Sequence, residues 1–234
     1  SIQVVPRAVL NEQKALTLTD AVRNIGGVGS DFGFNGSTQP LLILRGFPSS
    51  SMSAQGSMSG SATYYVDGIR LEGGPGNMAG AQAIEVGKGP ASVLYGRAGP
   101  GGLVSGVRKP LSATRSVGFE QTIGQHGLSR TIVEAGGALD ANNQFLGRAS
   151  LSMLDNGSPR AFVEDRLGGF NGTLAWVPGS ETRVSLSLDV VDQKYRTDYG
   201  VPADLATERP LQPNDNQQYN DAPELSRVRS RLLV

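Results

Sequence analysis

The sequence predicts a small α+β unit over residues 1–110, followed over residues 111–234 by antiparallel strands of a transmembrane β-barrel. Three observations lead to this fold class. Helix and strand patterns are mixed before Pro110, apolar and polar residues alternate with a period of two after it, and the later connections are short and long in turn. Long alternating strands with short turns at one end and long loops at the other are typical of a barrel wall.

The composition excludes several classes of protein. Basic and acidic residues balance at 21 each, so the chain has no overall field that would attract nucleic acid. No apolar run reaches the roughly 18 residues that a membrane-spanning helix needs. Cysteine is absent, which removes disulfides, thiol catalysis and cysteine zinc sites. Glycine is unusually common, at 32 of 234 residues, and this abundance indicates many turns and close backbone approaches.

The first 30 residues predict one strand and two helical segments. Residues 1–5 have the composition of a short strand, and a helical turn follows over residues 6–13. Thr17 and Asp20 have the spacing of a capping box at the start of the second helix. A Gly-Gly pair at residues 26–27 is expected to end this helix. Its apolar face consists of residues at helical spacing: Leu18, Ala21, Val22 and Ile25.

The next segment predicts a buried strand, a loop and a hairpin. Residues 41–47, LLILRGF, read as one buried strand, and a serine-rich loop follows over residues 49–61. In TYYVDGIRL, residues 63–71, the pair Asp67-Gly68 separates two apolar runs, which is a strong signal for a β-hairpin. Asp67 is therefore interpreted as a turn residue, with catalysis the less favoured alternative.

Four stretches after Pro110 alternate apolar and polar residues: residues 115–123, 143–154, 168–176 and 182–191. Each run is about ten residues long, whereas the strands of a soluble sandwich, the alternative fold, usually have about five or six. With the last run at the C-terminal end, we count about six strands. The apolar sets are Val117, Phe119 and Ile123; Phe145, Ala149, Leu151 and Met153; Phe170, Leu174 and Trp176; and Val184, Leu186, Leu188 and Val190.

No catalytic motif is present. The glycine-rich stretch at residues 84–104 fails as a P-loop, because Lys88 is followed by Gly-Pro instead of a hydroxyl residue. It fails as a dinucleotide motif because a strand pattern, and no helix, follows it. His126 is the only histidine, so a catalytic triad or a multi-histidine metal site would have to be built around one residue in a predicted turn. We therefore expect neither an enzyme nor a metal site.

The glycine-rich stretch with its continuation, IEVGKGPASVLYGRAGPGGLVSGVRKP at residues 84–110, closely resembles the end of the plug domain in TonB-dependent outer-membrane receptors, particularly siderophore receptors. The resemblance covers essentially all of residues 1–110. The later strands and TDYGVPADL, residues 197–205, look like the first barrel strands and an extracellular loop of that family. Three further stretches resemble the family in the same order: residues 1–28, 43–47 and 64–70.

The resemblance implies a plug domain at residues 1–110 and the N-terminal part of a barrel at residues 111–234. The family barrel has about 22 strands, so about six strands cannot close it, and the chain is expected to be an N-terminal fragment or a truncated paralogue. It lacks a recognisable segment before the plug for the energy-transducing partner.

The implied function is energy-dependent uptake of a ferric siderophore at the cell outer membrane of a Gram-negative bacterium. The implied partners are the ferric siderophore, a TonB-type inner-membrane complex and outer-membrane lipid, with no cofactor and with iron carried only as ligand. The alternatives are a receptor for another nutrient, such as cobalamin, haem or a glycan, and a plug-like binding module that does not transport.

The resemblance also implies two sets of site residues. Lys88 stands where the family usually has arginine, and the alternative for it is a solvated surface cation. Arg45 is expected to face the ligand at the plug apex, and the alternative is that it only braces the plug by donating to carbonyls. The expected ligand-binding residues are Arg45, Phe34, Gln39, Glu72, Asn77, Met78, Tyr195 and Tyr199. The residues expected to form ion pairs between plug and barrel are Glu85, Lys88 and Arg97.

Overall fold

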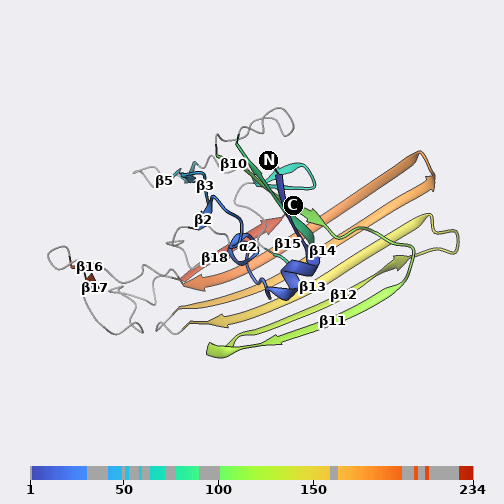
Figure 1. The fold of residues 1–234 in the computed structure, drawn as a ribbon. Helices are drawn as coiled ribbons and strands as arrows, with labels where there is room; N and C mark the ends of the chain where they lie inside the picture. Colours follow the sequence, from blue (N-terminus) through green and yellow to red (C-terminus); the bar gives the residue numbers. More distant parts are fainter. Residues whose placement is uncertain are drawn as a thin grey trace. The chain divides into compact units, whose positions relative to one another are not determined.

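The computed structural model describes most of the chain and divides it into two compact units, with the boundary after Pro110 (Figure 1). Within the described ranges no helix has the length and apolar character that crossing a membrane requires. The described residues are 2–30, 42–48, 51–52, 58–59, 64–71, 77–89, 101–158, 163–196, 203–204, 209–210 and 227–233.

The first unit is built on a five-stranded sheet with the order β1-β9-β10-β7-β8. β10 pairs with β7 in parallel, and the other neighbours are antiparallel. The central strands β9 and β10 supply the best buried side chains, among them Ile84 and Val86, both 0% exposed. The five strands are β1 (Ile2–Pro6), β7 (Tyr64–Val66), β8 (Ile69–Leu71), β9 (Ala81–Lys88) and β10 (Gly102–Arg108).

Short strands complete the described chain outside the two large sheets. A three-stranded antiparallel sheet has the order β2-β3-β4, and two further pairs, β5 with β6 and β16 with β17, have two residues per strand. The predicted loop at residues 49–61 thus contains two of these strands, which the serine-rich composition did not reveal. The strands are β2 (Val28–Ser30), β3 (Leu42–Leu44), β4 (Phe47–Pro48), β5 (Ser51–Met52), β6 (Met58–Ser59), β16 (Ala203–Asp204) and β17 (Arg209–Pro210).

Two tight hairpins are present in the first unit. The predicted hairpin at Asp67-Gly68 is confirmed, with positive φ angles of 48° and 83° in its two-residue turn. The prediction of one continuous strand over residues 41–47 is wrong, because the chain reverses at Arg45-Gly46, where φ is 52° and 81°. Two successive positive φ angles are typical of a type I′ turn, which matches the twist of the flanking strands.

The helices begin as predicted, and the second ends early. α1 covers Arg7–Glu12 and α2 covers Leu18–Val22. The capping box is confirmed: the Thr17 hydroxyl accepts from the Asp20 N–H at 3.2 Å, and the Asp20 carboxylate accepts from the Thr17 N–H at 3.0 Å. The Ile25 N–H donates to the Val22 carbonyl, so a tighter turn replaces the last helical turn before the glycine pair. Ile25 is still buried.

Removing the cap should weaken the first unit. Thr17→Ala deletes the hydroxyl that satisfies the Asp20 N–H, and loss of such a cap costs about 1 kcal/mol of unfolding free energy. Thr19→Ala is the matched control, because Thr19 lies inside α2 and has no capping role. The urea midpoint of the purified protein measures both effects. An equal shift for the two variants would contradict a specific contribution from the cap.

The second unit is a six-stranded antiparallel sheet with the order β11-β12-β13-β14-β15-β18 (Figure 1, green to red). The expected six strands are confirmed, and four of them have ten residues or more. Three of the described connections are short: residues 124–128 between β11 and β12, residues 139–144 between β12 and β13, and residues 180–181 between β14 and β15. The strands are β11 (Ser116–Ile123), β12 (Ser129–Ala138), β13 (Phe145–Gly157), β14 (Glu164–Gly179), β15 (Thr182–Arg196) and β18 (Arg227–Leu233).

Hydrogen bonds to one aspartate close the connection at residues 139–144. The Asp140 carboxylate accepts from the Phe145 N–H at 2.7 Å and from the Asn142 N–H at 3.2 Å. The bond from Phe145 is the main reason why the pKa of Asp140 lies below its ordinary value. His126 lies at a second turn, the 3-10 helix η1 (Gln125–Gly127), with a φ of 56°, as the turn prediction requires.

The two faces of this sheet differ in the way that the alternation predicts. We call the face that carries the large exposed hydrophobic side chains the apolar face, and the other the polar face. Ser150 and Ser152 lie on the polar face and are each 5% exposed, whereas Leu186 on the apolar face is 72% exposed. The apolar face is formed by Val117, Phe119, Ile123, Val133, Phe145, Leu151, Met153, Leu174, Trp176, Val184, Leu186, Leu188, Val190 and Leu233.

The apolar face of the second unit is exposed. Val184, Leu186 and Leu188 are between 43% and 72% exposed, whereas Leu42 and Ile84 are fully buried within the first unit. A soluble sandwich would bury one face of such strands against a second sheet. The structure therefore leaves a wide hydrophobic surface on consecutive long strands.

Candidate functional site

Arg45 lies in the tight turn between β3 and β4, and its guanidinium reaches the end of β9. The Arg45 N–H donates to the Gly27 carbonyl at 3.0 Å, which holds the turn beside the start of β2. Its Nη1 atom would be 3.2 Å from a Cβ placed on Gly89. The side chain itself is exposed. The turn thus presents a guanidinium on a rigid base, beside a residue that has no side chain to displace it.

The glycines of the stretch at residues 84–104 allow backbone segments to approach each other closely. The Gly89 N–H donates to the Gly101 carbonyl at 3.1 Å. A Cβ on Gly101 would be 2.6 Å from the Leu44 carbonyl oxygen, and a Cβ on Gly102 would overlap the Gly87 carbonyl oxygen. The described glycines therefore serve contacts inside the first unit, between β9, β10 and the Arg45 hairpin.

The expected ion-pairing residues Glu85 and Lys88 lie on β9, and both side chains are partly buried. Among the residues that the structure describes, no ion pair includes either of them. Glu85 stands opposite Val4 and Ser105 in the sheet, so its neighbours across the strands carry no charge. Pairing between plug and barrel stays a prediction, and Arg97 lies outside the described residues.

Asn77 and Met78 precede β9 and have different environments. The Asn77 side-chain carbonyl accepts from the Ala79 N–H at 3.0 Å, which makes a local turn. Met78 is 3% exposed and belongs to the core, and its backbone carbonyl accepts from the Arg7 guanidinium at 3.3 Å. Met78 therefore packs in the core of the first unit, and the ligand contact expected of it stays a prediction.

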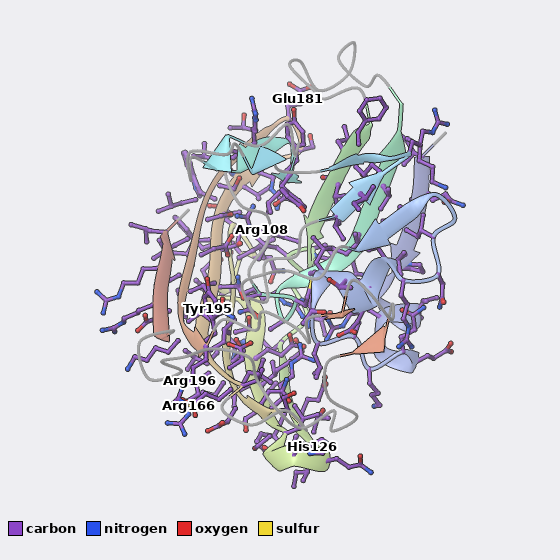
Figure 2. The ribbon with its side chains drawn as sticks, turned by 90° about the vertical axis from the view of Figure 1, so that its left-hand side faces the viewer. Arg108, His126, Arg166, Glu181, Tyr195 and Arg196 are labelled. Atoms are coloured by element: carbon purple, nitrogen blue, oxygen red, sulfur yellow. The ribbon has the colours of Figure 1, made fainter. Side chains whose placement is uncertain are left out.

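Tyr195 lies on the polar face of the second unit, beside two buried polar residues that sequence reasoning missed. Its Cα partner across the sheet is Asp165, and the Gln193 amide donates to the Asp165 carboxylate at 2.8 Å. Gln193 is 2% exposed and Asp165 is 8% exposed. Figure 2 shows Tyr195 on the same part of the sheet as Arg166 and Arg196. The sequence contained only one indication of Asp165 and Gln193, which is that polar residues occupy alternate positions of these strands. That pattern did not indicate that the two side chains are buried.

The structure describes only part of the expected ligand-binding site. Of the described side chains, no three His, Asp or Glu groups gather in a way that could hold a metal ion. Arg45, Asn77 and Tyr195 are the expected ligand-binding residues that are both described and at least partly accessible. Four members of the expected set lie outside the described residues: Phe34, Gln39, Glu72 and Tyr199.

Comparisons with known proteins agree on one class of protein, the TonB-dependent receptors. Residues 1–103 match the family model described as the TonB-dependent Receptor Plug Domain. The catecholate siderophore receptor Fiu of Escherichia coli (strain K12) is 28% identical over 212 residues, which cover 86% of this chain and 26% of that protein. The metal-pseudopaline receptor CntO of Pseudomonas aeruginosa is 28% identical over 204 residues, 87% of this chain and 27% of that protein. The chain spans about a quarter of these curated relatives.

The fold agrees with a solved receptor. The crystal structure of the siderophore receptor PiuA from Acinetobacter baumannii has a TM-score of 0.79 and 21% identity, and the match covers 94% of this chain and 31% of that one. At this identity the likeness shows the fold alone. Residues 1–103 are thus a TonB-dependent receptor plug domain, and most of the chain is similar to siderophore receptors, with antiparallel strands after the plug.

Proposed function

We propose that this chain is the N-terminal part of an outer-membrane receptor that takes up a ferric siderophore by energy-dependent transport. The observation that carries the proposal is a plug domain joined to a sheet of long strands whose exposed face is apolar. An apolar face of this extent is stable against lipid hydrocarbon, and the opposite polar face suits a water-filled lumen. The relatives that match most of the chain include receptors whose names specify siderophores.

The proposed mechanism needs no bond-making step. The ferric siderophore binds to exposed groups of the plug and of the loops above the sheet, with iron as cargo and not as a cofactor. A TonB-type inner-membrane complex then pulls on the plug from the periplasm. Arg45 supplies the strongest candidate contact, because an exposed guanidinium offers five N–H donors in a fixed fork to the oxygen atoms around the iron.

Uptake of radioactive iron tests the proposal. Cells that lack the complete receptor would be compared with cells that carry it, each with and without the energy-transducing complex. We expect uptake of at least one ferric siderophore only when both are present. Uptake of cobalamin, haem or a glycan in its place would contradict the siderophore assignment. Binding without any transport would instead support a binding module.

Arg45→Ala in the complete receptor should weaken siderophore binding by about 1–3 kcal/mol, the range for losing a charged hydrogen bond. Alanine and arginine share the Cβ atom, so the strain of the left-handed turn is unchanged. Arg45→Lys should restore only part of the affinity, because an ammonium lacks the planar fork. Arg23→Ala, at another exposed arginine of the first unit, is the control.

Titration of ligand binding and outer-membrane abundance together decide the role of Arg45. For a ligand contact, abundance stays near the unmutated level while affinity falls. Unchanged affinity in Arg45→Ala, or a loss of folded receptor in proportion to lost uptake, would make Arg45 a bracing residue of the plug. An equal loss of affinity in the Arg23 control would point to a general effect of charge.

A further inference from the structure

A band of charged side chains borders the apolar face at one end of the six-stranded sheet. The two sets share one side of the sheet: Asp155 is two residues beyond Met153, and Arg231 is two residues before Leu233. We call this band the charged belt, and its described members are Asp155, Glu164, Arg166, Asp192, Lys194, Arg196, Arg229 and Arg231.

The belt lies at the end of the sheet away from the turns at residues 139–144 and 180–181. Figure 2 shows Arg166 and Arg196 far from Glu181, which belongs to the short turn between β14 and β15. The opposite margin of the apolar face carries Phe145 and Trp176, whose rings stack with centroids 6.4 Å apart. The apolar face is thus bounded by aromatic rings at one end and by charges at the other.

The spacing between these margins fits the depth of a membrane. Phe145 and Met153 lie on β13 near the two margins of the apolar face, eight residues apart, which is about 27 Å along a strand at about 3.4 Å per residue. Strands in membrane barrels tilt by about 40°, which leaves a depth of roughly 20 Å, close to the apolar band of about 25 Å in such barrels. The belt would therefore lie at the level of lipid headgroups.

Internal ion pairs do not neutralise the belt. Its described members comprise five cations and three carboxylates, so two positive charges remain. Asp192 accepts from Arg229 at 2.9 and 2.7 Å and lies 3.5 Å from Arg231, so one carboxylate serves two guanidinium groups. Lys194 is exposed and forms no ion pair with any residue that the structure describes.

Two belt arginines are well placed to contact a neighbouring molecule. The Arg166 side chain is 64% exposed although it pairs with Asp155 at 3.3 Å, and the Arg231 side chain is 70% exposed. One ion pair uses at most two of the five N–H donors of a guanidinium. Each arginine therefore retains N–H donors that solvent or a neighbouring molecule can reach.

We propose that the charged belt binds the phosphate groups of anionic membrane lipids whose acyl chains cover the apolar face. Guanidinium groups match phosphate oxygens with two parallel hydrogen bonds, and basic side chains at a membrane margin attract anionic headgroups. The lipid is a better partner than free phosphate, because the adjoining hydrophobic surface holds the chains of the same molecule. This inference rests on the proposed membrane location of the sheet.

Lipid retention by the purified complete receptor tests the belt. The receptor in an uncharged detergent would be mixed with phosphatidylglycerol or with phosphatidylcholine of the same acyl chains, and native mass spectrometry would count the bound lipid. We expect a preference for phosphatidylglycerol in the unmutated receptor. R166Q/R231Q should reduce that preference about 25-fold, because each of the two basic residues near an anionic headgroup contributes about fivefold.

The control variant R23Q/R183Q removes the same two charges from exposed positions outside the belt and should keep the preference. R166K/R231K keeps the charges, loses the forks and should be intermediate. Equal retention of the two lipids by the unmutated receptor, or an equal loss in the control, would overturn the proposal. Displacement of phosphatidylglycerol by about 10 mM inorganic phosphate would also overturn it, since the belt would then be a site for free anions.

Iron uptake separates this inference from the proposed function. R166Q/R231Q should transport the ferric ligand at the unmutated rate, because no belt residue belongs to the proposed ligand-binding set. A receptor that transports but shows no lipid preference would refute the belt and leave the proposed function intact. An unmutated protein that fails to insert into lipid bilayers would refute the membrane location, on which both depend.

Discussion

Gly102→Ala is expected to destabilise the first unit by about 3 kcal/mol or more, because the added methyl group meets two obstacles. The φ angle of Gly102 is 135°, a conformation that residues with a side chain rarely adopt. In addition, the new Cβ would overlap the carbonyl oxygen of Gly87 on the paired strand β9. To relieve both the backbone strain and the overlap, β9 and β10 would have to separate. These two strands carry the core side chains Ile84 and Val104, so their separation would disrupt the core.

The urea midpoint of the purified protein and the rate of cleavage of residues 1–110 by trypsin measure this effect. Gly26→Ala is the matched control, because a Cβ at Gly26 would meet nothing within 4 Å and no positive φ is present there. We expect the control to change stability by less than about 0.5 kcal/mol. A similar small change in Gly102→Ala would show that the β9–β10 pairing adapts and that its close approach is not essential.

Leu186→Arg should destabilise the membrane-inserted receptor by about 2–4 kcal/mol, the cost of an arginine near the midplane on the lipid side of a barrel. Leu186 is 72% exposed and lies in the middle of the apolar face, between Val184 and Leu188 on β15. Its cross-strand neighbour on β14 is Leu174, which is also exposed, so β14 places no polar group directly opposite to accept the guanidinium.

Ser185→Arg is the control, because Ser185 is exposed on the polar face of the same strand. Guanidinium-induced unfolding of the complete receptor from phosphatidylcholine vesicles measures both variants. The proposed membrane location requires a much larger loss for Leu186→Arg than for Ser185→Arg. Equal losses, or a larger loss for Ser185→Arg, would mean that the apolar face is covered by protein and not by lipid.

Sequence reasoning succeeded wherever the signal was local. Alternation with a period of two correctly predicted which side chains share a face of the second sheet, because successive residues of a strand always point to opposite sides. The capping box at Thr17 and the Asp67-Gly68 hairpin were also predicted, since each depends on residues at most four positions apart. The motifs of residues 1–110 led to the right family for the same reason, as ordered local patterns.

The turn at Arg45 shows where local reasoning failed. Apolar residues on both sides of Arg45 read as one strand, and arginine is an uncommon residue at a positive φ angle. The turn is stabilised by partners distant in the sequence, the Gly27 carbonyl and the packing of Leu44 and Phe47 against Gly101. None of these partners can be found from the residues next to Arg45.

By itself, the sequence determined the class of the protein, the two faces of its long strands and the boundary at which the pattern changes. Tertiary structure alone decided that Arg45 lies beside Gly89, that Asp165 and Gln193 are buried together, and that the charged residues of four strands form one belt. The physical reason is that a repeating pattern depends only on the geometry of one strand. Contacts between strands depend on register and on the path of the chain between them.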